Sequence, residues 1–218
     1  MGLMTLTQFR VAVRLCLEDR TDLDPATANG ALFLNRWAND AYRHICLPSI
    51  YRHPGMQKSS TVTADDASTT YALASDVYAI RYVINDTKGL RYIPERPEEL
   101  REGTSGRDLT WAREGNNLIL RATSGTDGDT VRYHYWARPA LLSADGDVTE
   151  INEYFDAIIV TLAAAYGAAN LGMMERADYY DERAMRLINE HRDPGVFEAE
   201  DKGWRNEPTP MTSYSRDR

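Results

Sequence analysis

The spacing of apolar residues changes twice along this chain, and this change limits the folds open to it. Near both ends, apolar side chains recur every three or four positions, as they do on one face of a helix. Between about residues 58 and 139 they instead alternate with polar side chains, as in half-buried strands. The helices therefore stand before and after a block of strands, which favours an α+β fold over alternating strands and helices.

Two helices are predicted near the N-terminus. Thr5 and Gln8 have the spacing of a capping box, and an apolar stripe of helical period follows them. Asp24 and Pro25 are residue types preferred at a helix N-cap and at the first helical position, and a second stripe follows these. The second helix must end before Pro48, because proline does not fit a helix interior.

The middle of the chain is predicted to form about six strands in an antiparallel sheet or a small sandwich. Residues 77–84 and 90–93 are rich in β-branched and aromatic side chains and flank a turn, which indicates a hairpin. A second hairpin is expected around Gly115, and residues 131–137 alternate between the two faces of a strand. One helical turn is expected at residues 98–101.

Two further helices are predicted after Thr149. The first has a broad apolar face and ends at Gly172, and the second runs from Met174 to the stop at Pro194. The gap between them is so short that they must form an antiparallel helical hairpin. Small side chains at residues 163–169 leave room for a neighbour to pack closely on the first of these helices.

These patterns predict an α+β fold that consists of a four-helix bundle with an inserted antiparallel β-sheet or small β-sandwich and an extended C-terminal tail. The expected regions are a helical bundle at residues 1–57 and 140–192, an inserted β region at residues 58–139, and a docking tail at residues 193–218. A chain of 218 residues with 43% hydrophobic composition is large enough to bury a core.

The sequence contains no arrangement of side chains typical of a catalytic, cofactor or metal site. The four histidines have no zinc-binding spacing to one another or to a cysteine, and no phosphate-binding or nucleophile motif occurs. The acidic pairs around Gly128 and Gly146 lack the other ligands of a calcium loop and are interpreted as turns. Cys16 and Cys46 lie in apolar helical patterns, where a free thiol packs as a small hydrophobe. We expect no catalytic residue, no cofactor and no metal.

The charge balance argues against tight binding to nucleic acid. The chain has 25 Lys and Arg against 33 Asp and Glu, a net charge of -8, so the molecule as a whole repels phosphate. The aromatic side chains of the predicted strands could stack on bases, but acids are interleaved with the arginines, and sheet packing is the simpler use. No apolar run has the length needed to cross a bilayer, and we expect no membrane partner.

The segment after the last predicted helix is the most unusual part of the sequence. Residues 193–218 have no hydrophobic period and carry three prolines, many charges and isolated large side chains. Such a segment cannot fold alone, but spaced rings on an extended chain can anchor in the pockets of a partner. The predicted partner-binding residues are Phe197, Trp204, Arg205, Met211 and Tyr214.

Three segments give the chain a resemblance to the head-to-tail adaptor proteins of tailed phages, also called connector or head-completion proteins. They are LTQFRV at residues 6–11, LNRWANDAYR at residues 34–43 and YHYWARPALL at residues 133–142. The predicted helix over residues 152–171, with its alanine-rich end, adds to the similarity. The resemblance covers most of residues 5–192 in pattern.

The resemblance implies a structural virion protein of the neck, between capsid and tail, that is made in the cytoplasm of the host bacterium. It implies a ring, usually of twelve subunits, beneath the portal protein, with a downstream tail or stopper protein as a second partner and DNA only passing through the lumen. The small residues 163–169 would then suit contact between ring neighbours. The acidic balance would let DNA slide, and Phe197, Trp204 and Tyr214 would anchor the tail.

Three alternatives stay open from the residues alone. Another ring component of a phage neck or tail, such as a stopper or a tail terminator, is the first, although such proteins are typically smaller and richer in strands. A hydrolase acting on glycan would show converging acids in a deep pocket, with shifted pKa values. A nucleic-acid module would show a continuous basic face.

Overall fold

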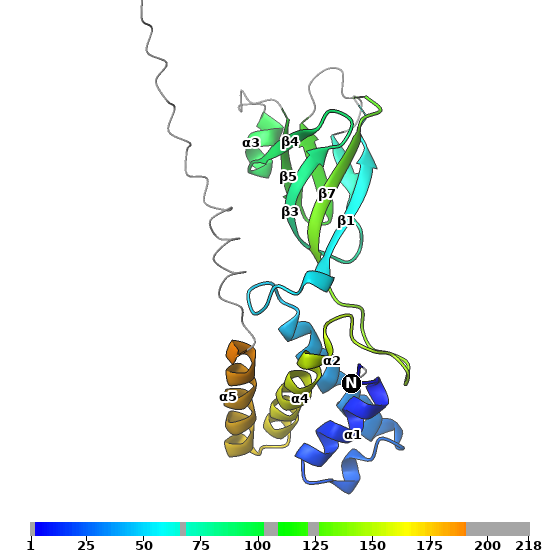
Figure 1. The fold of residues 1–218 in the computed structure, drawn as a ribbon, viewed down its shortest axis with the longest axis vertical. Helices are drawn as coiled ribbons and strands as arrows, with labels where there is room; N and C mark the ends of the chain where they lie inside the picture. The colour runs from blue at the N-terminus through cyan, green and yellow to red at the C-terminus, as the bar shows by residue number, and fades with distance from the viewer. Residues whose placement is uncertain (1–2, 66–68, 103–108, 122–126, 191–218) are drawn as a thin grey trace, which may run out of the picture.

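The computed structural model of the chain describes residues 3–65, 69–102, 109–121 and 127–190. It has two parts that lie end to end, with helices at one end and a curled sheet at the other (Figure 1). The chain leaves the helical part after its second long helix and returns to it after the last strand. The predicted docking tail, residues 193–218, lies outside the described residues.

The helices begin where local side chains can bond their first backbone amides. Thr5 Oγ1 accepts the Gln8 N–H while Gln8 Oε1 accepts the Thr5 N–H, so the predicted capping box is present. The second helix begins later than Pro25 suggested, because the hydroxyl of Thr27 is the group that accepts the Gly30 N–H. The long helices are α1 (Leu6–Cys16), α2 (Ala28–Ile45), α4 (Asp156–Asn170) and α5 (Met174–Glu190), with short 3-10 turns η1 (Thr21–Leu23), η2 (Pro54–Met56) and η3 (Glu153–Phe155).

The predicted four-helix bundle with an inserted antiparallel sheet is wrong. The described residues contain five α-helices, because α3 (Pro97–Glu102) belongs to the sheet part, and they contain a mixed sheet. The four long helices also do not pack symmetrically around one axis. Helix α4 packs against α1, α2 and α5, whereas α5 packs mainly on α4. Helical periodicity shows that an apolar face must be covered, but it does not show which neighbour covers it.

Helix α4 is the centre of the helical part. Ala163, Ala164 and Ala168 are fully buried, and the helices that cover α4 are α1, α2 and α5 of the same chain. The expectation that this small-residue run contacts a neighbouring copy is therefore wrong for its buried members. At Gly167 an added Cβ would lie 2.7 Å from Leu17 Cδ1 and 3.0 Å from the indole ring of Trp37, so only glycine allows this approach.

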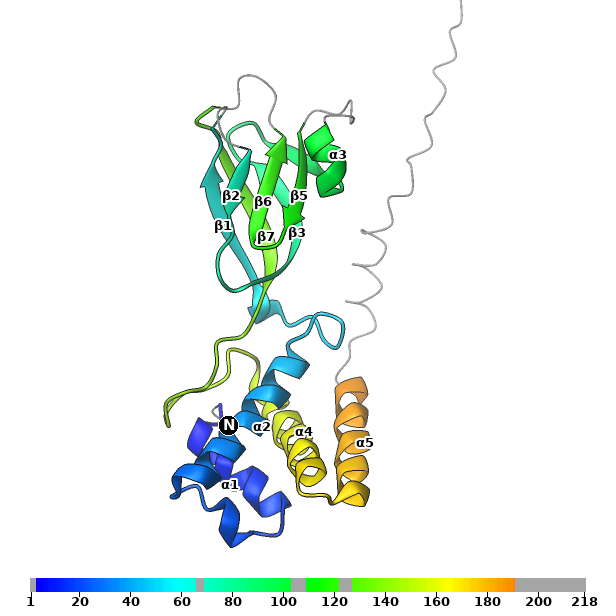
Figure 2. The same cartoon turned by 180° about the vertical axis from the view of Figure 1, so that it is seen from behind.

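The strands form one mixed sheet that curls into a nearly closed barrel (Figures 1 and 2). The order across the sheet is β1-β7-β3-β4-β5-β6-β2. All pairings are antiparallel except that of β4 with β5, which is parallel. The seven strands in the described part of the chain are β1 (Gln57–Thr63), β2 (Thr70–Ala72), β3 (Val77–Asn85), β4 (Leu90–Pro94), β5 (Thr110–Glu114), β6 (Asn117–Arg121) and β7 (Thr130–Ala137).

The parallel pair explains why the sheet differs from the prediction. Antiparallel strands can be joined by a tight turn, whereas parallel neighbours need a crossover connection, which is usually helical. Here α3 lies in the connection between β4 and β5, and Leu100 on α3 packs with Ala112 and Ile119 of β5 and β6. The sequence indicated the helical turn, but not the direction of the strand that follows it.

Alternate strand residues fill the barrel. Val83, Tyr92, Leu118 and Tyr133 are at most 2% exposed and belong to one buried cluster. The helical core is a different cluster, built around Trp37 and the residues of α4. Several strand aromatics are thus core residues, as the sequence indicated, and the two parts of the molecule each have a core of their own.

Gly167→Ala is expected to lower the free energy of unfolding by up to about 2 kcal/mol. The strain of overpacking, roughly 1 to 3 kcal/mol, should exceed the gain of about 1 kcal/mol that alanine gives over glycine in a helix. Urea denaturation followed by circular dichroism measures the change. Gly146→Ala is the matched control, because an added Cβ there meets no atom within 4 Å. Equal stability of both variants would contradict the packing assigned to α4.

Candidate functional site

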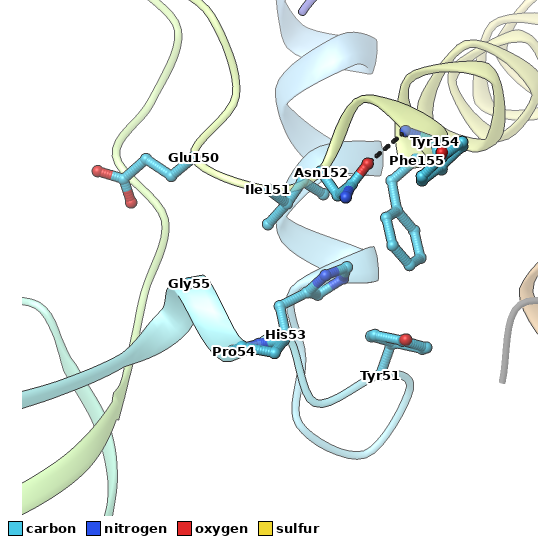
Figure 3. Close-up of a pocket in the computed structure, with 9 residues that line it drawn as sticks. All are labelled: Tyr51, His53, Pro54, Gly55, Glu150, Ile151, Asn152, Tyr154 and Phe155. Carbon is cyan, nitrogen blue, oxygen red and sulfur yellow. Dashed lines mark hydrogen bonds between the residues drawn. The ribbon is translucent and has the colours of Figure 1, made fainter. Parts of the chain in front are cut away.

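A groove lies at the junction between the helical part and the barrel (Figure 3). One wall comes from the segment that leaves α2 for β1, and the other from the segment that returns from β7 to α4. Its volume is about 560 Å³, and its lining residues are Tyr51, His53, Pro54, Gly55, Glu150, Ile151, Asn152, Tyr154 and Phe155. The two connections between the parts of the molecule therefore form the groove.

Three packed rings make one side of the groove apolar. The centroid of the His53 ring lies 4.3 Å from that of Phe155 and 4.5 Å from that of Tyr51, and the latter two lie 4.8 Å apart. His53 and Phe155 are buried, whereas Tyr154 beside them is 65% exposed. Edge-to-face and tilted ring pairs of this kind hold side chains in fixed positions, so the groove has a preformed aromatic wall.

In this ring cluster, His53 has one ring nitrogen, Nε2, that makes no hydrogen bond with the described residues. Burial lowers its pKa to about 4, and a hydrogen bond with the backbone of Ile45 only partly opposes that shift. Nε2 is buried and has no hydrogen-bond partner among the described residues, so the bond to Ile45 uses Nδ1. A neutral imidazole that carries its proton on Nδ1 can accept a hydrogen bond at Nε2.

Polar contacts fix the opposite side of the groove. The Glu150 N–H donates to Tyr42 Oη at 2.8 Å, and an added Cβ at Gly55 would lie 2.8 Å from the Glu150 carbonyl oxygen. Lys58 Nζ lies 3.4 Å from Asp76 Oδ2 and 3.8 Å from Glu150 Oε2. The half-exposed ion pairs add little stability one by one. Through Glu150 these contacts link the returning segment both to Tyr42 of α2 and to Lys58 of β1.

The returning segment is also tied to α1 before it reaches the groove. Arg10 is 8% exposed, and its guanidinium donates to Asn35 Oδ1 at 2.5 Å and to Asp145 Oδ1 at 2.6 Å. Asp147 Oδ2 accepts backbone N–H groups of the same turn, and these bonds lower the pKa of Asp147. The acidic pair around Gly146 thus has a structural role in the turn, as the sequence indicated.

The groove lacks the pair of converging acids that hydrolysis of a glycan needs. Glu150 is the single carboxylate among its lining residues. Asp156 is buried nearby, but it is occupied as an acceptor of the Met4 N–H at 2.7 Å and of the Thr149 hydroxyl at 3.4 Å. The groove therefore combines one carboxylate and several rings with a buried, neutral imidazole.

The remaining predictions concern the C-terminal tail, metal ions and membrane spans. The predicted partner-binding residues Phe197, Trp204, Arg205, Met211 and Tyr214 lie outside the described residues. In the part of the chain that the structure describes, no group of three or more His, Cys, Asp or Glu side chains could hold a metal ion. No helix in that part is long and apolar enough to cross a membrane.

The cysteines are free thiols on α1 and at the end of α2. Burial raises the pKa of Cys16, and it raises the pKa of Cys46 to about 12. Thiols with raised pKa values are poor nucleophiles, because the thiolate is the reactive form. Both side chains are therefore packing residues of the helical part.

Sequence reasoning missed the groove. Its aromatic residues lie in two connecting segments without hydrophobic period, about 100 residues apart. The one sequence feature that could have pointed to the groove is that Tyr51, His53 and Pro54 closely follow a predicted helix. This pattern by itself indicates only a turn.

The described part of the chain thus has two parts with separate core clusters, and the two segments that connect them form an aromatic groove. The chain belongs to the SU10 adaptor protein family, whose sequence profile matches residues 4–200. The resemblance to phage head-to-tail adaptors is thereby confirmed, and the protein is a structural adaptor and a virion component. No curated protein matches the chain.

His53→Phe is expected to remove the part of the acid-induced loss of stability that comes from this histidine. The folded-state pKa of about 4 lies below the ordinary value of 6.5, so His53 stabilises fully above pH 6.5 and loses that contribution as the pH falls toward 4. The loss between pH 7.5 and 4.5 should be about 2.5 kcal/mol.

The measurement is urea denaturation of the wild-type chain and of the variant at pH 7.5, 5.5 and 4.5. The difference between the two chains isolates His53, because all other groups are shared. A wild-type chain and a variant that lose the same free energy of unfolding in acid would show that His53 is not held neutral by burial.

Proposed function

We propose that this protein is the head-to-tail adaptor that forms a ring beneath the portal protein, with twelve subunits as the expected number, and links the capsid to the tail around the DNA channel. Its partners are the portal, a downstream tail or stopper protein, and other copies of the chain. The observation that carries the proposal is the family match over residues 4–200, nearly the whole chain. The protein is made in the host cytoplasm and works in the neck of the virion.

The architecture supports this role. The helical part and the barrel lie end to end (Figure 1), so each subunit offers different surfaces to partners on its two sides. A ring of identical chains also needs two different complementary patches on each subunit. A junction fixed by Tyr42, Lys58 and Glu150 keeps these surfaces in a constant relation.

We assign portal binding to the tail. In this proposal the helical region is residues 1–57 and 140–192, the inserted β region is residues 58–139, and the docking tail is residues 193–218. Helix α5 returns antiparallel along α4, so Glu190 lies at the end where α4 begins, which is the junction end (Figure 2). Ordering such a polar segment costs conformational entropy that contacts with a partner must offset. Its anchors are Phe197, Trp204, Arg205, Met211 and Tyr214.

The charge of the chain supports passage of DNA without tight binding. A net charge of -8 gives a repulsive average potential toward phosphate, which lowers the affinity of a channel for the DNA that moves through it.

Trp204→Ala is expected to weaken portal binding about tenfold to a hundredfold without unfolding the protein. Burial of such an anchor contributes on the order of 1.5 to 3 kcal/mol. A binding assay with purified portal compares the full chain, a chain that ends at Arg192 and Trp204→Ala, with Ser213→Ala as a control in the same segment. Circular dichroism verifies that all of them fold. Equal binding by the shortened chain would place the portal contact on the folded part.

A further inference from the structure

The end of α5 lies level with the aromatic groove. Helix α5 runs antiparallel to α4 and has 17 residues against 15, with residues 171–173 as the connection. At a rise of about 1.5 Å per residue, α5 therefore ends at the height of η3, the turn that precedes α4. Tyr154 and Phe155 of η3 line the groove (Figure 3). The chain thus leaves its last helix at the end of the helical part where the groove lies.

Core contacts near its end hold α5 in this place. Ala184 is fully buried and Ile188 is 3% exposed, and both belong to the core cluster of the helical part. The axes of packed helices lie roughly 8 to 10 Å apart. Phe197 follows Glu190 by seven positions, and seven extended residues span at most about 25 Å. A segment of this length reaches from α5 to the groove with residues to spare for a turn.

The sequence after α5 favours such a return. Asp193, Pro194 and Gly195 are residue types typical of tight turns, with proline directly before glycine as in a type II turn. Residues 189–195 carry no large apolar side chain, so Phe197 is the first ring after the helix. It is therefore the first side chain of the tail that gains from burial in an apolar groove.

The groove can accommodate an aromatic side chain. Its volume of about 560 Å³ lies in the range of roughly 300 to 1,000 Å³ that is usual for pockets that hold small ligands. Tyr154 is 65% exposed, so much of its surface is open to a further contact. Aromatic rings gain free energy from tilted and edge-to-face pairing, as the rings of Tyr51, His53 and Phe155 already show. One more ring would extend this cluster.

The groove also contains a hydrogen-bond acceptor that lacks a donor. His53 is 3% exposed, and its Nε2 makes no hydrogen bond with the described residues. A buried polar atom without a partner costs free energy, which a donor from elsewhere would recover. The main chain of a segment laid in the groove carries N–H donors of this kind. A polypeptide segment therefore suits the groove better than an isolated ring.

We propose that Phe197 docks in this groove of its own chain, against Tyr154 and the packed rings beside it, and so holds the start of the tail at the junction. Its consequence for portal binding rests on the tail contact proposed above. A tail that is fixed at its base has fewer conformations to lose when its far end binds, which lowers the entropic cost of portal binding. The residues left for the portal are then Trp204, Arg205, Met211 and Tyr214.

The test follows amide hydrogen exchange by mass spectrometry in the full chain, without portal. Phe197→Ala removes the docked ring, and Tyr154→Ala removes the exposed wall of the groove. Met211→Ala is the matched control in the tail, and Tyr154→Phe is the matched control in the groove because it keeps the ring. Circular dichroism verifies that all four variants fold, and each is measured at low and at high protein concentration.

We expect the amides of residues 193–201 to exchange at least about tenfold more slowly in the wild-type chain and in both controls than in Phe197→Ala and Tyr154→Ala. The difference should be the same at both protein concentrations, because the contact lies within one chain. Equal exchange in the wild-type chain and Phe197→Ala would overturn the contact. Rapid exchange in Phe197→Ala alone would place the ring outside this groove. Slow exchange only at high concentration would assign the groove to the tail of a second copy.

This proposal and the portal contact of the tail fail in different experiments. The exchange measurement contains no portal, so a docked Phe197 would stand even if the shortened chain bound the portal as the full chain does. Conversely, weak portal binding by Trp204→Ala together with rapid exchange of residues 193–201 in the wild-type chain would keep the portal contact and remove the contact with the groove.

Discussion

The burial of α4 is the constraint on which the helical part depends. Ala163, Ala164, Gly167 and Ala168 are small enough for α1, α2 and α5 to approach this helix on several sides. The indole of Trp37 lies only 3.0 Å from the place that a Cβ at position 167 would take. Close packing of this kind gains dispersion contacts with little side-chain entropy to lose. The α2–α4 contact in turn sets the distance between the two segments that lead to the barrel, and so the width of the groove.

The junction joins the helical core to the barrel core. The barrel core and the helical core are separate clusters, but Trp136 of β7 belongs to the helical one. The orientation of one part on the other therefore depends on this side chain and on the contacts of the connecting segments. The Tyr42–Glu150 bond, the ion pairs of Lys58 and the rings around His53 supply those contacts. For an adaptor, a defined orientation is useful because the surfaces at the two ends of the molecule then keep one geometry.

Charge is distributed unevenly over the molecule, so the net charge alone does not describe each of its surfaces. The net charge of -8 argues against tight binding of DNA, but it conceals an outer sheet face on which Arg81 and Arg91 stack against rings. The acidic surface that makes up the rest of the molecule repels a long polyanion such as DNA.

The sequence by itself determined the local elements: the capping box at Thr5, the hairpin around Gly115, the helical turn after Pro97 and the family. The local elements each depend on residues a few positions apart, whereas the family is indicated by segments spread along the chain. Only the tertiary structure decided that the sheet is mixed and curled, that α4 is covered by its own chain, and that the segments around His53 and Glu150 form one groove. Hydrophobic period records that a face is buried, whereas the choice of the neighbour that buries it depends on contacts between residues far apart in the chain.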